Sequence, residues 1–378
     1  MKIIRPCTAL WLLILTLTLG ACVAAPPPFD EEKWHKTIEG QTVDAIYAPN
    51  QRNGVFFNPW NPMQGKSLGQ FLRWRFSRTA PYTEAEKTFL PKVIPDLDRR
   101  MQTLDDQDFL AWIGHATFLI RVNRTFWLTD PMLSKRALLP ARHTPPALDM
   151  DFLRSITAPL NVVISHSHYD HLDTATIKAL PGHATVVVPR GLGDYVRKLH
   201  SGKVSEMDWW ETLDMDNGTR LTCLPAQHWS RRIGQDVNTT LWASYLIAAP
   251  DVSDYFGGDS GYFSGYREIA KRFPQIDYAL MPLTAYHPRW FMHYAHMNAP
   301  ETIQAFQDLR AKVFIPTQWG TFRLGDNPPG FPVLDLKRTI DRLNLNPDPF
   351  LIMDIGDIRL LDRQQPLAGV EGDTLGQN

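Results

Sequence analysis

Cysteine is scarce in this chain, with three among 378 residues. Cys7 lies inside an apolar N-terminal segment and Cys22 at the end of it, which leaves only Cys223 in the rest of the sequence. A single remaining thiol cannot form an internal disulfide, even in an oxidising compartment. Stability must therefore come from a hydrophobic core, and the roughly 350 remaining residues suffice for one large domain or two small ones.

The chain also lacks an excess of either positive or negative charge. Lys and Arg number 39, Asp and Glu number 40, and the formal net charge is −1. Because surfaces that bind nucleic acid are usually basic, no nucleic-acid partner is expected. Residues 30–108 contain no cluster of catalytic side chains. The candidates for chemistry therefore lie beyond residue 108.

The N-terminus has the features of a secretion signal. Lys2 and Arg5 precede an apolar run over residues 9–19, which is too short to span a bilayer comfortably. The sequence Leu19-Gly20-Ala21-Cys22 follows and resembles a bacterial lipoprotein cleavage site. By this resemblance, residues 1–21 are the signal peptide and Cys22 carries the lipid. An uncleaved anchor and an ordinary signal peptide are the alternatives.

The residue after Cys22 is Val23 and not an acidic residue. By resemblance to lipoprotein sorting, this favours the outer membrane of a bacterial envelope, with the protein facing the periplasm. Residues 24–28 include three prolines and form an extended tether. Membrane attachment is thus expected through lipid on Cys22.

The remaining chain is expected to divide into three parts. Residues 22–108 comprise the tether and an arm, irregular or helical, that packs on the main domain, with a helix predicted over residues 84–104. The tryptophan-rich arm is interpreted as core cover, or as an apolar wall for a lipid-like substrate or a membrane-facing patch. Residues 109–363 form the hydrolase domain and residues 364–378 a C-terminal tail.

In the main domain, β-branched and aromatic runs alternate with helical patterns. Strands are predicted over residues 109–120, 125–131, 160–164, 184–189, 203–207, 241–248, 277–282 and 312–316. This alternation is typical of an α/β fold in which helices cover a sheet.

The loop over residues 164–173 follows one of these strands and has the composition of a metal site. His166 and His168 are two residues apart on extended backbone, so both can reach one cation. Asp170 and His171 lie on the turn into the next helix and can face a second cation. A histidine-rich loop that binds nothing is the alternative reading.

Further candidates come from distant parts of the sequence. His228 follows a predicted strand and can supply a third nitrogen ligand. Asp259 lies in a glycine-flanked turn, where its carboxylate can bridge two cations. Asp130 is expected to orient a ligand histidine from behind, and His115 is either a second group of that kind or a core histidine.

The loop is the signature of the metallo-β-lactamase superfamily, which this chain resembles. More closely, the chain is similar to the N-acyl-phosphatidylethanolamine-hydrolysing phospholipase D family. The similarity begins near Phe57-Asn58-Pro59-Trp60 and rests on Trp112-Ile113-Gly114-His115-Ala116-Thr117, Asp208-Trp209-Trp210, Gln227-His228-Trp229, Gly258-Asp259-Ser260-Gly261-Tyr262, Pro288-Arg289-Trp290-Phe291-Met292 and Trp319-Gly320-Thr321-Phe322.

The resemblance implies an αββα sandwich with two ions of zinc or another divalent metal. His166, His168 and His228 would hold the first ion, Asp170 and His171 the second, and Asp259 would bridge them. The family has a further histidine where this chain has Gln318. An amide oxygen is a weaker ligand than an imidazole, so the second site is expected to bind its ion less tightly.

The implied reaction is attack of a metal-activated hydroxide on a phosphodiester of a phospholipid. Asp170 and His296 are the expected catalytic residues, with His287 and His293 as rivals of His296, and Tyr169 is expected near the lipid. A lactonase or other ester hydrolase on the same fold is an alternative. A non-catalytic envelope protein, with Gln318 as the sign of decay, is another.

Overall fold

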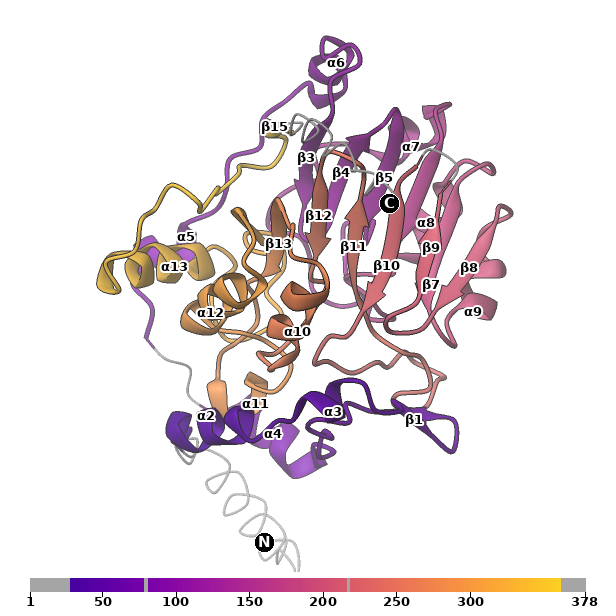
Figure 1. The fold of residues 1–378 in the computed structure, drawn as a ribbon. Coiled ribbons are helices and arrows are strands. Elements are labelled where there is room, and N and C mark those ends of the chain that lie inside the picture. Colours follow the sequence, from indigo (N-terminus) through magenta and orange to yellow (C-terminus); the bar gives the residue numbers. More distant parts are fainter. Residues whose placement is uncertain (1–27, 78–80, 216–217, 362–378) are drawn as a thin grey trace, which may run out of the picture.

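Two β-sheets packed face to face form the centre of the computed structural model (Figure 1). The structure describes residues 28–77, 81–215 and 218–361. The expected signal peptide, the lipidation site Cys22 and the tail over residues 364–378 lie outside the described residues.

The first sheet has seven strands in the order β15-β3-β4-β5-β6-β7-β8. The strands β5 to β8 run parallel to one another, while β15, β3 and β4 are antiparallel to their neighbours. Their bounds are Phe109–Gly114 (β3), Thr117–Val122 (β4), Thr125–Thr129 (β5), Leu160–Val163 (β6), Thr185–Pro189 (β7), Val204–Met207 (β8) and Ile358–Leu360 (β15).

The second sheet has six strands in the order β14-β13-β12-β11-β10-β9. Here β12, β13 and β14 are parallel and the remaining pairs antiparallel. Their bounds are Thr212–Asp214 (β9), Arg220–Leu224 (β10), Ser244–Ala248 (β11), Ser253–Phe256 (β12), Tyr278–Pro282 (β13) and Val313–Thr317 (β14).

Helices cover the outer face of each sheet (Figure 1). Those on the first sheet are α7 (Met150–Ser155), α8 (Thr174–Ala179) and α9 (Gly193–Arg197), and those on the second are α10 (Gly265–Arg272), α12 (Ala299–Leu309) and α13 (Phe331–Arg342). The other described elements are α2 (Glu31–Glu39), α3 (Val43–Ile46), β1 (Gln51–Arg52), β2 (Val55–Phe56), α4 (Leu68–Phe76), α5 (Glu84–Thr88), α6 (Leu97–Gln102) and α11 (Arg289–Met292).

The alternation of side chains along β3 explains this layering. Leu110 and Trp112 belong to the hydrophobic cluster that contains the second sheet. Phe109 and Ala111 point the other way, into a cluster with residues of α7, α8 and α9. Because successive side chains of a strand face opposite sides, a strand that is apolar throughout must be covered on both faces. The predicted αββα sandwich is confirmed.

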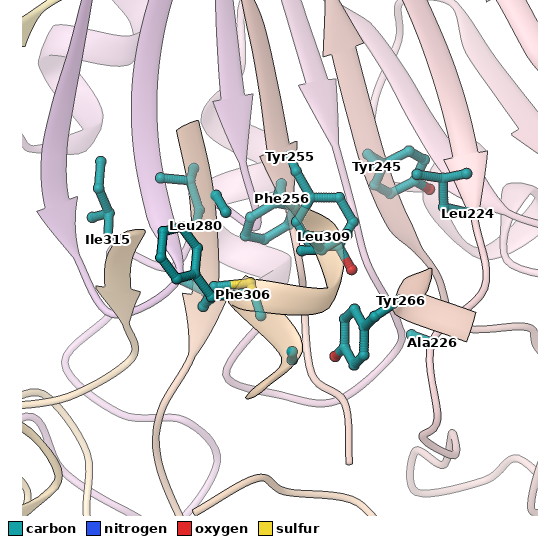
Figure 2. Close-up of a cluster of buried hydrophobic side chains, with 14 of the residues drawn as sticks. Leu224, Ala226, Tyr245, Tyr255, Phe256, Tyr266, Leu280, Phe306, Leu309 and Ile315 are labelled. Carbon is teal, nitrogen blue, oxygen red and sulfur yellow. The ribbon is translucent and has the colours of Figure 1, made fainter. Parts of the chain in front are cut away.

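Aromatic side chains dominate the core of the second sheet (Figure 2). Tyr255 and Phe256 of β12 are buried in one cluster with Tyr266 of α10 and with Phe306 and Leu309 of α12, where the helices contact the sheet. Large rings bury much apolar area, so this contact fixes the two helices against the sheet.

Two predictions about local structure were wrong. Residues 109–120 are not one strand, because the chain reverses at Gly114 and His115, with φ of 123° and 55°, to form the β3–β4 hairpin. Residues 84–104 are not one helix: α5 ends at Thr88 and α6 begins only at Leu97. Pro91 and Pro95 lie between the two helices, and proline disfavours helix at and before its own position.

The first part of the N-terminal arm, from α2 to α4, lies along one end of the sandwich, whereas α6 lies at the opposite end (Figure 1). Trp34 of α2 donates a hydrogen bond to Glu301 (2.8 Å), and Trp60 stacks on Phe263 with ring centroids 4.8 Å apart. In contrast, α4 has no buried residue. No helix among the described ranges has both the length and the apolar character to cross a membrane.

Gly261 is a position where the fold tolerates no side chain. A Cβ atom there would lie 2.0 Å from the carbonyl oxygen of Tyr294, a backbone atom of the loop that carries His296. We expect Gly261→Ala to lower the free energy of unfolding by about 1–3 kcal/mol in urea denaturation, because the loop must move away. Gly69→Ala is the control, since its Cβ would meet only the Ser67 hydroxyl at 3.8 Å. Equal stability of both variants would contradict this packing.

Candidate metal centre

Three imidazoles from two separate loops converge at one end of the sandwich. His166 and His168 follow β6, and His228 follows β10. His166 Nε2 lies 2.8 Å and His228 Nε2 3.2 Å from His168 Nδ1. The Asp259 carboxylate completes the group, with Oδ2 3.7 Å from His166 Nε2 and 3.5 Å from His228 Nε2. Three nitrogens and a carboxylate oxygen at this spacing can surround one cation.

A second group of ligand atoms adjoins the first. Asp170 Oδ2 lies 3.2 Å from His171 Nε2 and 3.0 Å from His115 Nε2. The same His171 nitrogen is 3.4 Å from Asp259 Oδ2. Asp259 therefore lies near both groups, and its role as a bridging carboxylate stays a prediction. His115 lies against the centre because the β3–β4 reversal carries it there.

Several polar atoms of the candidate ligand residues lack a partner in the part of the chain that the structure describes, which suits the binding of cations. Four buried polar atoms of the candidate ligand residues have no hydrogen-bond partner among the described residues: His168 Nε2, His171 Nε2, Asp259 Oδ1 and Gln318 Oε1. Unpartnered buried polar atoms are costly unless a ligand binds them.

The charge states of the donors also suit metal binding. Burial lowers the pKa of His166 and His228 well below the usual range, and that of His168 to about 4, so these imidazoles are neutral donors at neutral pH. Burial alone would raise the pKa of Asp259, but His171 and His228 lower it well below its usual range. The first group thus combines neutral imidazoles with an ionised carboxylate. In the second group the opposite holds for His171: burial lowers its pKa, but Asp259, Asp170 and Asp130 outweigh burial and hold that pKa well above the usual range, so a cation would have to displace a proton there.

Asp130 and Ser165 contact the candidate ligand histidines through the ring nitrogens that face away from the centre. Asp130 lies at the end of β5 and accepts hydrogen bonds from the backbone N–H and hydroxyl of Ser165, at 2.6 and 2.5 Å. Its carboxylate is also 2.6 Å from His171 Nδ1. Ser165 Oγ lies 2.8 Å from His166 Nδ1. These contacts fix the ring orientations and leave each Nε2 directed toward the centre.

Gln318 lies at the end of β14 in the left-handed region, with φ of 72°. Its backbone N–H donates to the His115 carbonyl and its side-chain amide to the Gly258 carbonyl, both at 3.0 Å. The amide oxygen is then the atom left for a cation. This arrangement places Gln318 beside both His115 and the turn that carries Asp259.

The centre opens into a cavity of about 720 Å³. His168, Asp170, Asp259 and His296 line it, and the His296 ring lies 5.4 Å from that of His228. The other two histidines of the same loop have other partners. His287 is 2.6 Å from the Tyr82 hydroxyl, and His293 Nδ1 is 2.8 Å from the Arg289 carbonyl. His296 is thus the loop histidine placed for chemistry.

Tyr169 lies outside the lining of this cavity as described. Its hydroxyl accepts a hydrogen bond from the backbone of Ile233 (3.1 Å), and Arg232 stacks 4.1 Å above its ring. Arg232 in turn donates to the carbonyls of Ser167 (2.8 Å) and Leu172 (3.0 Å). Tyr169 and Arg232 together brace the loop that carries the ligands.

Sequence reasoning missed three residues of this region: Ser165, Arg232 and Lys66. Ser165 lies inside the motif, beside His166, and could have been found from that position. Arg232 and Lys66 carry no local signal, because their contacts depend on segments far apart in the chain.

We expect His166→Ala to abolish binding of the first ion, because two imidazoles and one carboxylate oxygen are too few donors for a stable site. The measurement is the metal content of the purified protein after dialysis, by atomic emission. His183→Ala is the control, since this exposed histidine contacts only the Ala158 carbonyl among the described residues. Near-normal metal content in the His166 variant would refute the assignment.

For Gln318, we expect the natural protein to retain one ion through dialysis and to bind the second more weakly. The difference should approach the roughly 10–100-fold scale of altered ligand support. Gln318→His should merge the two steps of a metal titration followed by calorimetry, since His is among the residues that tolerate a positive φ. Equal, tight binding of both ions before and after the substitution would contradict this role.

Comparison with known proteins agrees with the fold and the site. The family model described as "Beta-lactamase superfamily domain" matches residues 125–319. An uncharacterized protein of Mycobacterium tuberculosis is 37% identical over 308 residues, covering 76% of this chain and 78% of the relative. N-acyl-phosphatidylethanolamine-hydrolyzing phospholipase D 1 of Caenorhabditis elegans is 32% identical over 346 residues, covering 84% of this chain and 96% of the relative.

Among solved structures, a "possible metal-dependent hydrolase" from Veillonella parvula superposes with a TM-score of 0.56 at 18% identity, covering 68% of this chain and 100% of that one. This likeness supports the fold. The protein is therefore a metal-dependent hydrolase. It belongs to the metallo-β-lactamase superfamily and, within it, resembles the N-acyl-phosphatidylethanolamine-hydrolysing phospholipase D family.

Proposed function

We propose that the protein is a zinc-dependent phosphodiesterase of phospholipase D type that acts on N-acyl-phosphatidylethanolamine or a similar phospholipid. The observation that carries the proposal is the position of the metal ligands in a cavity of about 720 Å³ whose other walls are largely apolar. The similarity to the Caenorhabditis elegans enzyme, over nearly its whole length, supports the same substrate class.

Helix α4 forms part of the apolar wall. Leu68, Phe71 and Trp74 of this helix line the cavity. Leu68 is 73% exposed, and Phe71 is exposed as well. Across the mouth, Val237 lines the same cavity and Ile233, in the same loop, is 78% exposed. Apolar side chains gathered at the mouth of a polar centre suit a substrate that enters with acyl chains attached.

The N-terminal sequence supports a place at a membrane. Lipid on Cys22 would hold the protein at the outer membrane, on the periplasmic side, as the sequence predicts. Exposed apolar side chains of α4 would then meet the lipid surface that supplies the substrate. Lipid attachment and the apolar mouth together favour a phospholipid over a small soluble ester.

Zinc ions held by the ligands described above would lower the pKa of a water molecule and offset charge on a phosphoryl oxygen. The chain's own groups then position the reacting atoms. Asp170 is held by His115 and His171 and directs its carboxylate into the cavity. His296 donates a hydrogen bond toward the phosphate.

The net reaction breaks the bond between phosphorus and the oxygen of the leaving alcohol. Oxygen from water forms the new bond to phosphorus, and a proton from that water ends on the alcohol. For N-acyl-phosphatidylethanolamine, the products are phosphatidic acid and an N-acylethanolamine. Both can be measured in a single extract.

The test is hydrolysis of N-acyl-phosphatidylethanolamine in mixed micelles by the purified full-length protein loaded with zinc, with products measured by mass spectrometry. We expect phosphatidic acid and N-acylethanolamine in equal amounts, and a loss of at least about 100-fold in Asp259→Asn, because the neutral amide no longer offers a bridging carboxylate. His183→Ala should retain full activity.

A panel of lactones and uncharged esters completes this experiment. Turnover of the panel with no release of phosphatidic acid from N-acylated or plain phosphatidylethanolamine would show an ester hydrolase instead. No turnover of any substrate at full metal loading would favour a binding protein on the same fold.

A further inference from the structure

Lys66 lies just before α4, where two cavities adjoin. One is the metal cavity, and the other is a more polar cavity of about 460 Å³. Both are lined by Met63, Gly65, Lys66 and Phe291. Lys66 is the only charged member of this shared wall, so its ammonium can reach whatever occupies either space.

The Lys66 ammonium has no anionic partner among the described residues. Its Nζ lies 3.9 Å from the centroid of the Phe291 ring. Burial lowers the pKa of Lys66 to about 8. The nearby Arg289, by contrast, pairs with Glu301 at 2.6 Å. The Phe291 ring attracts the ammonium, but a ring face does not pair its charge as a carboxylate would. Lys66 therefore remains able to bind an anionic ligand.

The charge of Lys66 acts toward the reaction centre. Burial is the main cause that lowers the pKa of His296, and the Lys66 ammonium adds to it, against an opposing effect of Asp259. His296 lines the metal cavity together with Asp170 and Asp259. The same ammonium also contributes to lowering the pKa of His293, after burial and Arg289, and His293 lines the smaller cavity. The charge of Lys66 thus acts on a histidine of each cavity.

We propose that Lys66 binds an anionic oxygen of the substrate's phosphodiester and thereby selects phosphodiesters over uncharged esters. This inference rests on the proposed function. A phosphodiester has two non-bridging oxygens that share one negative charge. When one of them faces the metal ligands, the other remains for a cation on the adjoining wall. A lactone or carboxylic ester offers no such oxygen, and Lys66 would stay unpaired.

Other cations of the region suit this task less well. Lys33 lines only the smaller cavity and is exposed. Arg231 lines the metal cavity but is also exposed, where water screens its charge. Lys66 is half-buried and lines the metal cavity, so water screens its charge less than that of the two exposed cations.

The test compares Lys66→Met, Lys66→Gln and Lys66→Arg with the natural protein, all full-length and loaded with zinc. Two chromogenic substrates with the same leaving group are used: bis(p-nitrophenyl) phosphate and p-nitrophenyl acetate. Inorganic phosphate serves as a competing anion. Lys33→Met is the matched control, because it removes a lysine that lines the smaller cavity alone.

We expect Lys66→Met and Lys66→Gln to lower kcat/KM for the phosphodiester on the order of tenfold or more, chiefly through KM. The inhibition constant for phosphate should rise by a similar factor. Hydrolysis of the acetate ester should stay within about twofold. Lys66→Arg should restore part of the loss, and Lys33→Met should behave like the natural protein. Zinc content and melting temperature should be retained, since methionine fills similar space without the buried charge.

An unchanged inhibition constant for phosphate in both neutral variants would overturn the proposal. Equal losses on the two substrates would overturn it as well, because they would indicate a structural role. If the natural protein hydrolyses only uncharged esters while phosphate binding still depends on Lys66, the proposed function fails and the anion site stands. If the protein hydrolyses phosphodiesters at a rate that does not depend on Lys66, the proposed function stands and the proposed role of Lys66 fails.

Discussion

The position of Asp259 among three histidines is the constraint on which the centre depends. Its carboxylate lies within 3.7 Å of His166, His171 and His228, which come from the loops after β6 and β10. Asp259 itself is reached only through the turn after β12, where Gly258 has a φ of 57°. Ends of strands from both sheets must therefore meet at one edge of the sandwich. The apolar contact between the two sheets aligns these strand ends. The site therefore forms only when the core is packed.

The N-terminal arm extends this dependence to a part of the chain with no metal ligands. Asn58 donates to the carbonyl of His228 at 3.0 Å and accepts from Trp242 at 3.0 Å. It is buried and also donates to the Tyr294 hydroxyl at 2.6 Å, on the loop that carries His296. The arm thus supports the third imidazole from outside and then continues into α4, the wall of the cavity. One segment therefore links ligand geometry to the shape of the substrate site.

The sequence alone was enough for those parts of the site that depend on local pattern. His166, His168, Asp170 and His171 follow a buried strand within one loop, so spacing and residue type identify them together. The β3–β4 reversal was missed because the runs on either side of it are apolar, and only Gly114, His115 and Thr117 interrupt them. The break between α5 and α6 could have been predicted from Pro91 and Pro95. The role of Lys66 could not be predicted, because it arises only where two cavities meet in the folded chain.

Gln318, at a position where the family resemblance implies an imidazole, and Lys66 would act on different steps of recognition. Both imidazole and amide are neutral donors, so the charge of the centre is the same with either and only the strength of one ligand changes. Two divalent cations facing Asp170 and Asp259 would keep an excess of positive charge, which attracts any anion. Attraction of that kind does not determine how the phosphodiester is oriented. A single ammonium on one wall would determine it, because one phosphate oxygen would face that ammonium and turn away from the metal ligands. The leaving alcohol would then be oriented as well.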